Sequence, residues 1–206
     1  FGSKFSIPGI SLPPFWHEMV TPQHIKKVRR QKKGSNLLRN SLYNPRLFTR
    51  KTEENVMDWG MKNRLSKIIK PKDGRTVMLA VDHGYFMGPT SGLEQLDKMV
   101  NPLLPYADTL MLTRGALRNY IDPTCDIPIV LRVSGGTSII GKELLHEGTV
   151  VSIEDAIRLN ASGVAYSILV GAEFERDTIL GMTQYIDEAE RYGIPVIAVT
   201  AVGKEM

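Results

Sequence analysis

The sequence predicts an α/β fold that is built from parallel β-α-β units. The first observation behind this prediction is a series of short apolar runs, rich in Val, Ile and Leu, that alternate with helical patterns. Such continuous apolar runs are typical of strands buried on both faces of a parallel sheet. The second observation is that polar residues follow several of these runs at their carboxyl ends, where parallel α/β folds bind ligands. The alternation fits a doubly wound sheet as well as a (β/α)8 barrel, and the polar strand ends favour the barrel.

Six apolar runs are predicted to be strands, and helices are predicted between them. In the first helix, Met61, Leu65 and Ile68 recur at helical spacing. Ser152 is expected to cap a later helix, with Asp155 in the first turn, where negative charge suits the helix dipole. The strands are expected at 76–81, 108–112, 128–133, 149–151, 163–170 and 195–202, and further helices near 92–104 and 175–192. The apolar face of the last helix is expected to comprise Ile179, Met182, Tyr185, Ile186 and Ala189.

The composition is ordinary for a globular protein. The chain has 206 residues, of which 42% are hydrophobic and 23% charged, and this length suits one sizeable domain. The single cysteine, Cys125, excludes an internal disulfide and fits a reducing compartment. No apolar stretch approaches the roughly 20 residues that a bilayer span needs, and no signal-peptide pattern is present. We therefore expect a cytoplasmic protein without a membrane partner.

The charge is unevenly distributed along the chain. Residues 1–55 carry 11 Lys and Arg against 3 Asp and Glu, whereas residues 56–206 carry 15 against 19. The high isoelectric point is therefore a property of the N-terminal segment and does not indicate nucleic-acid binding by the whole chain. We expect residues 1–55 to be a basic, poorly structured extension and residues 56–206 to form six βα units. Since the chain opens with Phe1 and stops two residues after Lys204, we expect a fragment.

Lys204 follows the last predicted strand and is the strongest candidate for a catalytic residue. A lysine held against apolar walls loses hydration, which disfavours its ammonium form and lowers its pKa. The neutral amine can then attack a carbonyl carbon and form a Schiff base. A solvated lysine in a loop after the strand is the structural alternative.

Five other residues at the strands are candidates for the same site. Asp82 would orient a substrate hydroxyl or move protons, or else cap a turn. His83 would bind a substrate oxygen or serve a structural role. Arg114 and Arg132 would hold a phosphate or carboxylate, or else pair with nearby acids. Tyr166 would face the interior as a proton donor, or else pack in the core. No Cys/His cluster suggests a metal site.

Three stretches carry a resemblance to a known family, and residues 82–90, Asp-His-Gly-Tyr-Phe-Met-Gly-Pro-Thr, are the most specific. Thr113-Arg114-Gly115 and Val202-Gly203-Lys204 follow in the same order. With these stretches, residues 57–206 resemble the archaeal-type class I fructose-bisphosphate aldolases. Within that family, the chain is most similar to thiolases that break down the quorum-sensing signal autoinducer-2.

The resemblance implies a (β/α)8 TIM barrel, truncated here after strand six. It implies that Lys204 forms the Schiff base on strand six and that Asp82 acts at the end of strand one. The aldolases use a tyrosine near the end of strand five as proton donor. Here Tyr166 lies within the strand and Phe174 occupies the loop, which favours the thiolase branch. Strands seven and eight supply much of the family's phosphate site, so we expect the 206-residue chain alone to be inactive or poorly stable.

The function implied by the resemblance is transfer of an acetyl group from a phosphorylated pentanedione to coenzyme A. Coenzyme A is a co-substrate, and no bound cofactor or metal is expected, because the imine supplies the electrophile. The family forms rings of barrels, so a homo-oligomer is expected. One alternative is a class I aldolase that cleaves a sugar phosphate such as fructose 1,6-bisphosphate. Another is a non-catalytic fragment whose basic segment, residues 26–33, binds polyanions.

Overall fold

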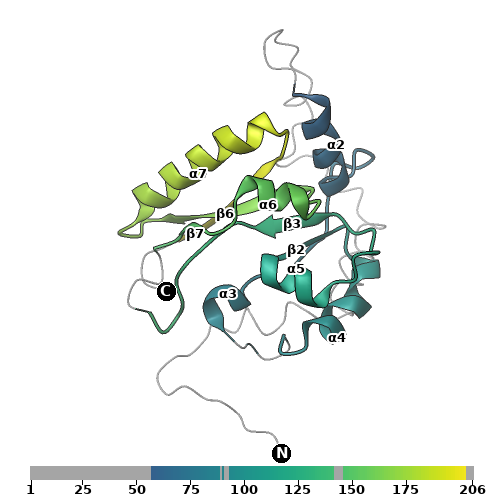
Figure 1. The fold of residues 1–206 in the computed structure, drawn as a ribbon, viewed down its shortest axis with the longest axis horizontal. Helices are drawn as coiled ribbons and strands as arrows, with labels where there is room; N and C mark the ends of the chain where they lie inside the picture. Colours follow the sequence, from purple (N-terminus) through teal and green to yellow (C-terminus); the bar gives the residue numbers. More distant parts are fainter. Residues whose placement is uncertain (1–56, 89, 91–92, 142–145, 203–206) are drawn as a thin grey trace, which may run out of the picture. The chain divides into compact units, whose positions relative to one another are not determined.

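A computed structural model of the chain describes residues 57–88, 90, 93–141 and 146–202. The N-terminal segment predicted to be a basic extension, and Lys204, lie outside these described residues. The centre of the described part is a five-stranded parallel sheet (Figure 1). In sheet order, its strands are β1 (Met78–Ala80), β2 (Thr109–Thr113), β3 (Ile129–Arg132), β6 (Gly163–Val170) and β7 (Val196–Val202).

After β1, each strand of this sheet pairs with the sheet strand that comes before it in the sequence. The pairing is continuous from Met78↔Thr109 at one edge to Val170↔Val202 at the other. This order, with crossovers between all neighbours, is that of a barrel rather than of a doubly wound sheet, whose order reverses at a switch point. The five strands form a curled half-barrel, which confirms the barrel class expected from the sequence.

The prediction that residues 149–151 form a strand of the parallel sheet is wrong. β3 pairs directly with β6, so no strand lies between them. Residues 148 and 149 instead form β5 (Gly148–Thr149), which pairs antiparallel with β4 (Ser134–Gly135) in a separate small sheet. Both residues of β5 are exposed, whereas a strand inside a parallel sheet is buried on both faces.

Helices connect the strands, and one of them differs from its prediction. The segment expected to be a single helix at 92–104 divides into an α-helix and a 3-10 helix, because Pro102 and Pro105 lack the N–H that would continue the α-helical ladder. The helices are α2 (Trp59–Ile68), α3 (Gly84–Met87), α4 (Leu96–Val100), η3 (Asn101–Tyr106), α5 (Arg114–Tyr120), α6 (Ile153–Arg158) and α7 (Glu175–Arg191). Within the described residues, no helix is long and apolar enough to cross a membrane.

Side-chain caps define where three of these helices begin. Asp58 accepts a hydrogen bond from the Met61 amide at 2.9 Å and opens α2. Thr113 accepts one from the Ala116 amide at 3.2 Å and opens α5 directly after β2. Ser152 caps α6 as predicted, accepting from the Asp155 amide at 3.3 Å. Each cap satisfies one backbone amide at the beginning of its helix.

Two apolar clusters lie on opposite faces of the sheet. The cluster towards α6 and α7 includes Leu131, Val164 and Tyr185, and we call this the helix face. The other cluster lies on what we call the inner face, which carries Met111, Val130, Ala165 and Ile197 and is covered at one end by Ile68 of α2. Alternate residues of each strand therefore point to opposite faces.

The predicted apolar face of α7 is confirmed only in part. Tyr185 and Ala189 are buried against the helix-face cluster, and Met182 packs beside them. Ile179 and Ile186 are each 38% exposed, so they lie at the border of the buried stripe. Thr178, which periodicity did not select, is fully buried and donates to the Glu175 carbonyl at 2.9 Å.

Candidate active site

Three polar side chains from the ends of β1 and β3 and from within β6 meet on the inner face. Arg132 lies two residues after Val130, and Ser167 lies two residues after Ala165, so strand alternation places both on the inner face. Asp82 lies two residues beyond the end of β1, and the β1–β2 pairing continues that far through a bond from the Val81 amide to the Met111 carbonyl at 2.8 Å. Residues from three strands of the parallel sheet therefore meet at one polar site.

Asp82 and Arg132 form a buried ion pair at this site. Nε and Nη2 of Arg132 each lie 2.6 Å from Oδ2 of Asp82, and both side chains are 6% exposed. Nη1 of Arg132 donates to Ser167 Oγ at 2.7 Å. Within the described residues, no partner engages Oδ1 of Asp82. The guanidinium therefore fixes one oxygen of the carboxylate.

A second buried carboxylate, Glu147, extends this network. Its Oε2 accepts a hydrogen bond from Ser134 Oγ at 2.8 Å, and its Oε1 accepts a short hydrogen bond from the Tyr85 hydroxyl. Ser134 Oγ in turn accepts from the Ser167 amide at 2.9 Å. Glu147 is 7% exposed. The network thus runs without a break from β1 to the β4–β5 hairpin.

The ring of Tyr85 fills the space between Arg132 and the hairpin. The Arg132 guanidinium carbon lies 5.4 Å from the ring centroid, within the range of a cation–π contact. A Cβ on Gly135 would lie 3.1 Å from Cδ2 of Tyr85, so glycine at this position lets the ring approach. Burial raises the pKa of the Tyr85 hydroxyl above its ordinary value, and the hydrogen bond to Glu147 and its negative charge raise it further, although Arg132 and Ser167 oppose them. Tyr85 is therefore a neutral phenol at physiological pH.

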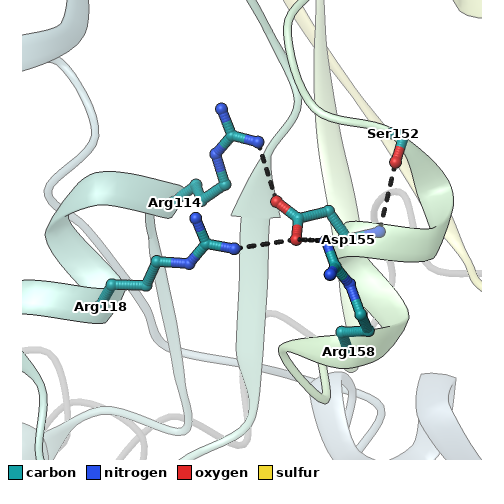
Figure 2. A network of polar contacts seen from close by, with 5 residues as sticks. All are labelled: Arg114, Arg118, Ser152, Asp155 and Arg158. Carbon is teal, nitrogen blue, oxygen red and sulfur yellow. Dashed lines mark hydrogen bonds and ion pairs between the residues drawn. The ribbon is translucent and has the colours of Figure 1, made fainter.

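Arg114, a second predicted anion-binding residue, lies in a different cluster. Its Nη1 donates to Oδ2 of Asp155 at 2.8 Å (Figure 2). Arg118 of α5 and Arg158 of α6 contact Oδ1 of the same carboxylate, at 2.8 and 2.5 Å. The hydrogen bond from Arg114 is the main cause that lowers the pKa of Asp155. Of the two roles considered for Arg114, pairing with a nearby acid is the one observed, and the cluster joins α5 to α6.

Tyr166 packs in the helix-face core rather than facing the interior. Its ring lies 5.9 Å from that of Tyr185, and its hydroxyl lies 3.3 Å from Thr149 Oγ1. A Cβ on Gly181 would lie 2.5 Å from this hydroxyl, so α7 touches it closely. Because Tyr166 is adjacent to Ser167, strand alternation points it away from Arg132. Core packing is thus the role that the structure supports.

Two further residues considered from the sequence, His83 and Phe174, lie shortly after β1 and β6. His83 is half-buried, precedes α3, and its carbonyl accepts from the Phe86 and Met87 amides at 3.3 and 3.1 Å. Phe174, which replaces the tyrosine expected of an aldolase, precedes α7 and stacks on the His146 ring with centroids 4.0 Å apart. Lys204 comes two residues after β7 and lies outside the described residues.

Three residues of the site, Tyr85, Glu147 and Ser167, were not selected from the sequence. Tyr85 lies inside the specific 82–90 stretch, so it could have been considered with Asp82 and His83. Ser167 lies within β6 and carries only a small polar group of a kind that is also common in turns. Glu147 follows a segment with no apolar periodicity, and no local pattern marks it as buried.

The chain belongs to the DeoC/LacD aldolase family, because the sequence profile of that family matches residues 76–205. It is 53% identical over 151 residues to the 3-hydroxy-5-phosphonooxypentane-2,4-dione thiolase of Enterobacter sp. (strain 638), covering 73% of this chain and 51% of that protein. It is 49% identical over 151 residues to the protein of that name from Escherichia coli (strain K12 / DH10B), covering 73% and 52%. The chain thus spans about half the length of the curated relatives that it matches. The family expected from the sequence is confirmed.

Solved structures support the fold. The crystal structure of an archaeal fructose 1,6-bisphosphate aldolase superposes with a TM-score of 0.57 at 22% identity, covering 71% of this chain and 60% of that one. A fructose-bisphosphate aldolase from Slackia heliotrinireducens DSM 20476 gives a TM-score of 0.56 at 14% identity, covering 74% and 55%. At these identities, the likeness shows a shared fold and no more.

Proposed function

We propose that the protein transfers an acetyl group from 3-hydroxy-5-phosphonooxypentane-2,4-dione to coenzyme A through a Schiff base on Lys204. The single observation that carries this proposal is the identity of about half of all residues, over 151 positions, with several thiolases that bear this substrate in their names. The proposal places the reaction in the cytoplasm, in a homo-oligomer, with coenzyme A as co-substrate and without a bound cofactor.

Each step of this reaction has a candidate group. The Lys204 amine condenses with a ketone carbon of the substrate, and water leaves. The thiol of coenzyme A then adds to the acetyl carbonyl and gives up its proton. When this adduct collapses, the carbonyl re-forms as a thioester, the neighbouring carbon–carbon bond breaks, and the protonated imine accepts its electron pair. The phosphorylated three-carbon fragment leaves as dihydroxyacetone phosphate after hydrolysis of the imine.

Asp82 is proposed to orient the substrate or transfer a proton at the imine. The double contact of Arg132 with Oδ2 supports this role, because it fixes the orientation of the carboxylate in the site. Arg132 would then position Asp82 rather than bind the substrate phosphate. His83, adjacent to Asp82, stays a candidate for contact with a substrate oxygen.

Cleavage of a sugar phosphate is the second candidate function. A protein of Pasteurella multocida (strain Pm70) that is called an uncharacterized aldolase is 51% identical over 151 residues, which is as similar as the thiolases. An aldolase would use the same imine and the same Asp82 without coenzyme A. Phe174 favours the thiolase, because its ring offers no hydroxyl for proton transfer to a leaving aldehyde.

Borohydride trapping on the full-length protein tests the imine. We expect dihydroxyacetone phosphate and borohydride to leave a reduced adduct on Lys204, located by peptide mass spectrometry. Lys204→Met should abolish the adduct, whereas Lys98→Met, at an exposed position of α4, should leave it unchanged. If the parent protein gives no adduct on Lys204, the imine mechanism is wrong.

Product analysis then separates the two functions. Acetyl-coenzyme A formed from the phosphorylated pentanedione supports the thiolase. Cleavage of fructose 1,6-bisphosphate at a comparable rate, without coenzyme A, would instead support the aldolase.

A further inference from the structure

We propose that Tyr85 and Glu147 form the proton-transfer pair of the active site, with Tyr85 exchanging a proton with the substrate carbon and Glu147 exchanging it with Tyr85. This inference rests on the proposed Schiff-base function and adds the proton donor, which sequence patterns left unassigned. Neither residue is needed to form the ion pair of Asp82 and Arg132.

The contacts of Tyr85 define the direction in which a proton can move. Its hydroxyl donates to Oε1 of Glu147, so the phenol proton already lies between the two oxygens. The face of its ring is against the Arg132 guanidinium, which itself contacts Asp82. Tyr85 thus spans the interval between the inner-face carboxylate and the carboxylate of the hairpin.

Glu147 is placed so that it can change protonation without leaving the site. Ser134 Oγ donates to its Oε2, and the Ser167 amide donates to Ser134 Oγ, so the carboxylate is held by two hydroxyls and, through Ser134, by the backbone of β6. A hydroxyl can rotate and serve as donor or acceptor, so these contacts tolerate either form of the acid.

The chemistry of the proposed reaction needs such a pair, because two proton transfers must balance. The thiol loses its proton as the carbon–sulfur bond forms, and Glu147 takes that proton. After the carbon–carbon bond breaks, the electron pair lies in an enamine on Lys204, whose carbon needs a proton to return to the imine. Tyr85 gives its phenol proton to that carbon and recovers one from Glu147. No proton is gained or lost overall.

The position of Tyr85 fits this task better than those of the other two tyrosines with buried rings. Tyr166 and Tyr185 lie on the helix face, with their rings in contact with each other. Strand alternation turns Tyr166 away from the inner face, and Tyr185 lies on α7. Tyr85 alone of these three reaches the Asp82–Arg132 pair, in the part of the chain that the structure describes.

Proton exchange into dihydroxyacetone phosphate tests the pair apart from the whole reaction. The full-length protein would be incubated with this ketone in D2O, and loss of the exchanging C–H signal followed by proton NMR. Tyr85→Phe is expected to slow exchange by about 100-fold or more, the usual effect of removing a general acid–base group. The borohydride adduct on Lys204 should still form, because imine formation does not need this proton.

Glu147→Gln and a matched tyrosine variant sharpen the test. Glu147→Gln keeps an oxygen that accepts from Tyr85 but cannot take up a proton, so exchange should slow by about 10-fold or more. Tyr185→Phe removes a hydroxyl that is buried on the helix face without a hydrogen-bond partner among the described groups, so exchange should match the parent protein. If Tyr85→Phe fails to fold, Glu147→Gln decides.

Three results would overturn the inference. Exchange within about threefold of the parent in Tyr85→Phe, with the adduct retained, would remove Tyr85 from proton transfer and leave the Schiff-base function intact. Loss of both adduct and exchange in a folded Tyr85→Phe protein would make Tyr85 a residue of substrate positioning instead. Absence of both in the parent would overturn the proposed function together with this inference.

Discussion

Both Nε and Nη2 of Arg132 lie 2.6 Å from one oxygen of Asp82, and this contact joins the end of β3 to the residue that follows β1. β2 lies between β1 and β3 in the sheet, so the ion pair of Asp82 and Arg132 spans β2 on the inner face. An ion pair so buried is stable only if both charges and their remaining donors are satisfied. Ser167 supplies one such partner from β6.

Arg132→Ala should be strongly destabilising, because it leaves the Asp82 carboxylate buried without its cation. We expect the free energy of unfolding to fall by about 3–5 kcal/mol, as measured by urea denaturation. Arg158→Ala is the matched control, since the Arg158 side chain is 74% exposed and should cost less than about 1 kcal/mol. A loss for Arg132→Ala no larger than that of the control would mean that water solvates Asp82 in place of the guanidinium.

The strands of the parallel sheet were predictable because a strand that is buried on both faces has a continuous run of apolar residues. Five of the six expected runs are strands, and β6 has the bounds that its apolar run predicts. The run at 149–151 misled because three β-branched or small residues suffice to suggest a strand, whereas Gly148 and Thr149 are exposed and pair only with the short β4. Short apolar runs do not distinguish these cases.

The site was only partly predictable, since sequence gives positions at strand ends and not the partners of the side chains. Asp82 and Arg132 were both selected, but their mutual contact depends on strand order in space. Arg114 was selected on the same grounds, yet it turns outward to Asp155 because it begins a helix rather than ending a strand. Glu147 directly precedes β5, whose pairing with β4 no periodicity indicates.

Asp155 should contribute stability that depends on pH. Its hydrogen bond from Arg114, and the charges of Arg118 and Arg158, lower the pKa of its carboxyl below the ordinary 3.8. A carboxyl with a lowered pKa in the folded state stabilises the protein above its ordinary pKa, and this stability is lost as the pH falls through the lowered value. Asp155→Asn should therefore lower the unfolding temperature at pH 7, and the difference from the parent should shrink below pH 3.8.

Asp177→Asn is the control for that titration. Its carboxylate lies 3.9 Å from Arg176, and both side chains are largely exposed, so its replacement should change the unfolding temperature little at any pH. If Asp155→Asn behaves like Asp177→Asn at pH 7, the three arginines repel one another as strongly as they attract the carboxylate.

Tyr85 and Tyr185 should remain protonated at a pH where exposed tyrosines ionise. Burial is the main cause that raises the pKa of each above 10.0, and nearby carboxylates, Glu147 for Tyr85 and Glu188 for Tyr185, add to it. A pKa raised in the folded state gives stability that is present below the unfolded value of 10.0 and lost as the pH rises through the folded value. The protein should therefore lose stability above pH 10, and Tyr85→Phe and Tyr185→Phe should each flatten that loss.

Ultraviolet difference absorbance of phenolate measures this directly. The sequence contains 7 tyrosines. While the protein stays folded, the absorbance change near pH 10 should correspond to the ionisation of fewer than 7 tyrosine hydroxyls. Complete titration of all tyrosines near pH 10 in the native protein would contradict the burial of both hydroxyls.

Gly181→Ala should test the close approach of α7 to β6. A Cβ at this position would lie 2.5 Å from the Tyr166 hydroxyl, and Tyr166 is 1% exposed, so its ring has little room to move. Overpacking of this kind costs about 1–3 kcal/mol, more than alanine gains in a helix relative to glycine. Gly115→Ala, in α5, is the control because nothing lies within 4 Å of its Cβ, and it should be neutral or stabilising by up to about 1 kcal/mol.

Tyr166→Phe should relieve the clash, because without the hydroxyl the nearest ring atom lies 3.4 Å from the new Cβ, an ordinary contact. We expect the double variant Tyr166→Phe/Gly181→Ala to be more stable than Gly181→Ala alone, by about 1 kcal/mol or more in urea denaturation. The gain must exceed the change that Tyr166→Phe causes in the parent, where the hydroxyl keeps its 3.3 Å contact with Thr149. Additive effects of the two substitutions would show that α7 moves away from the sheet instead of pressing on Tyr166.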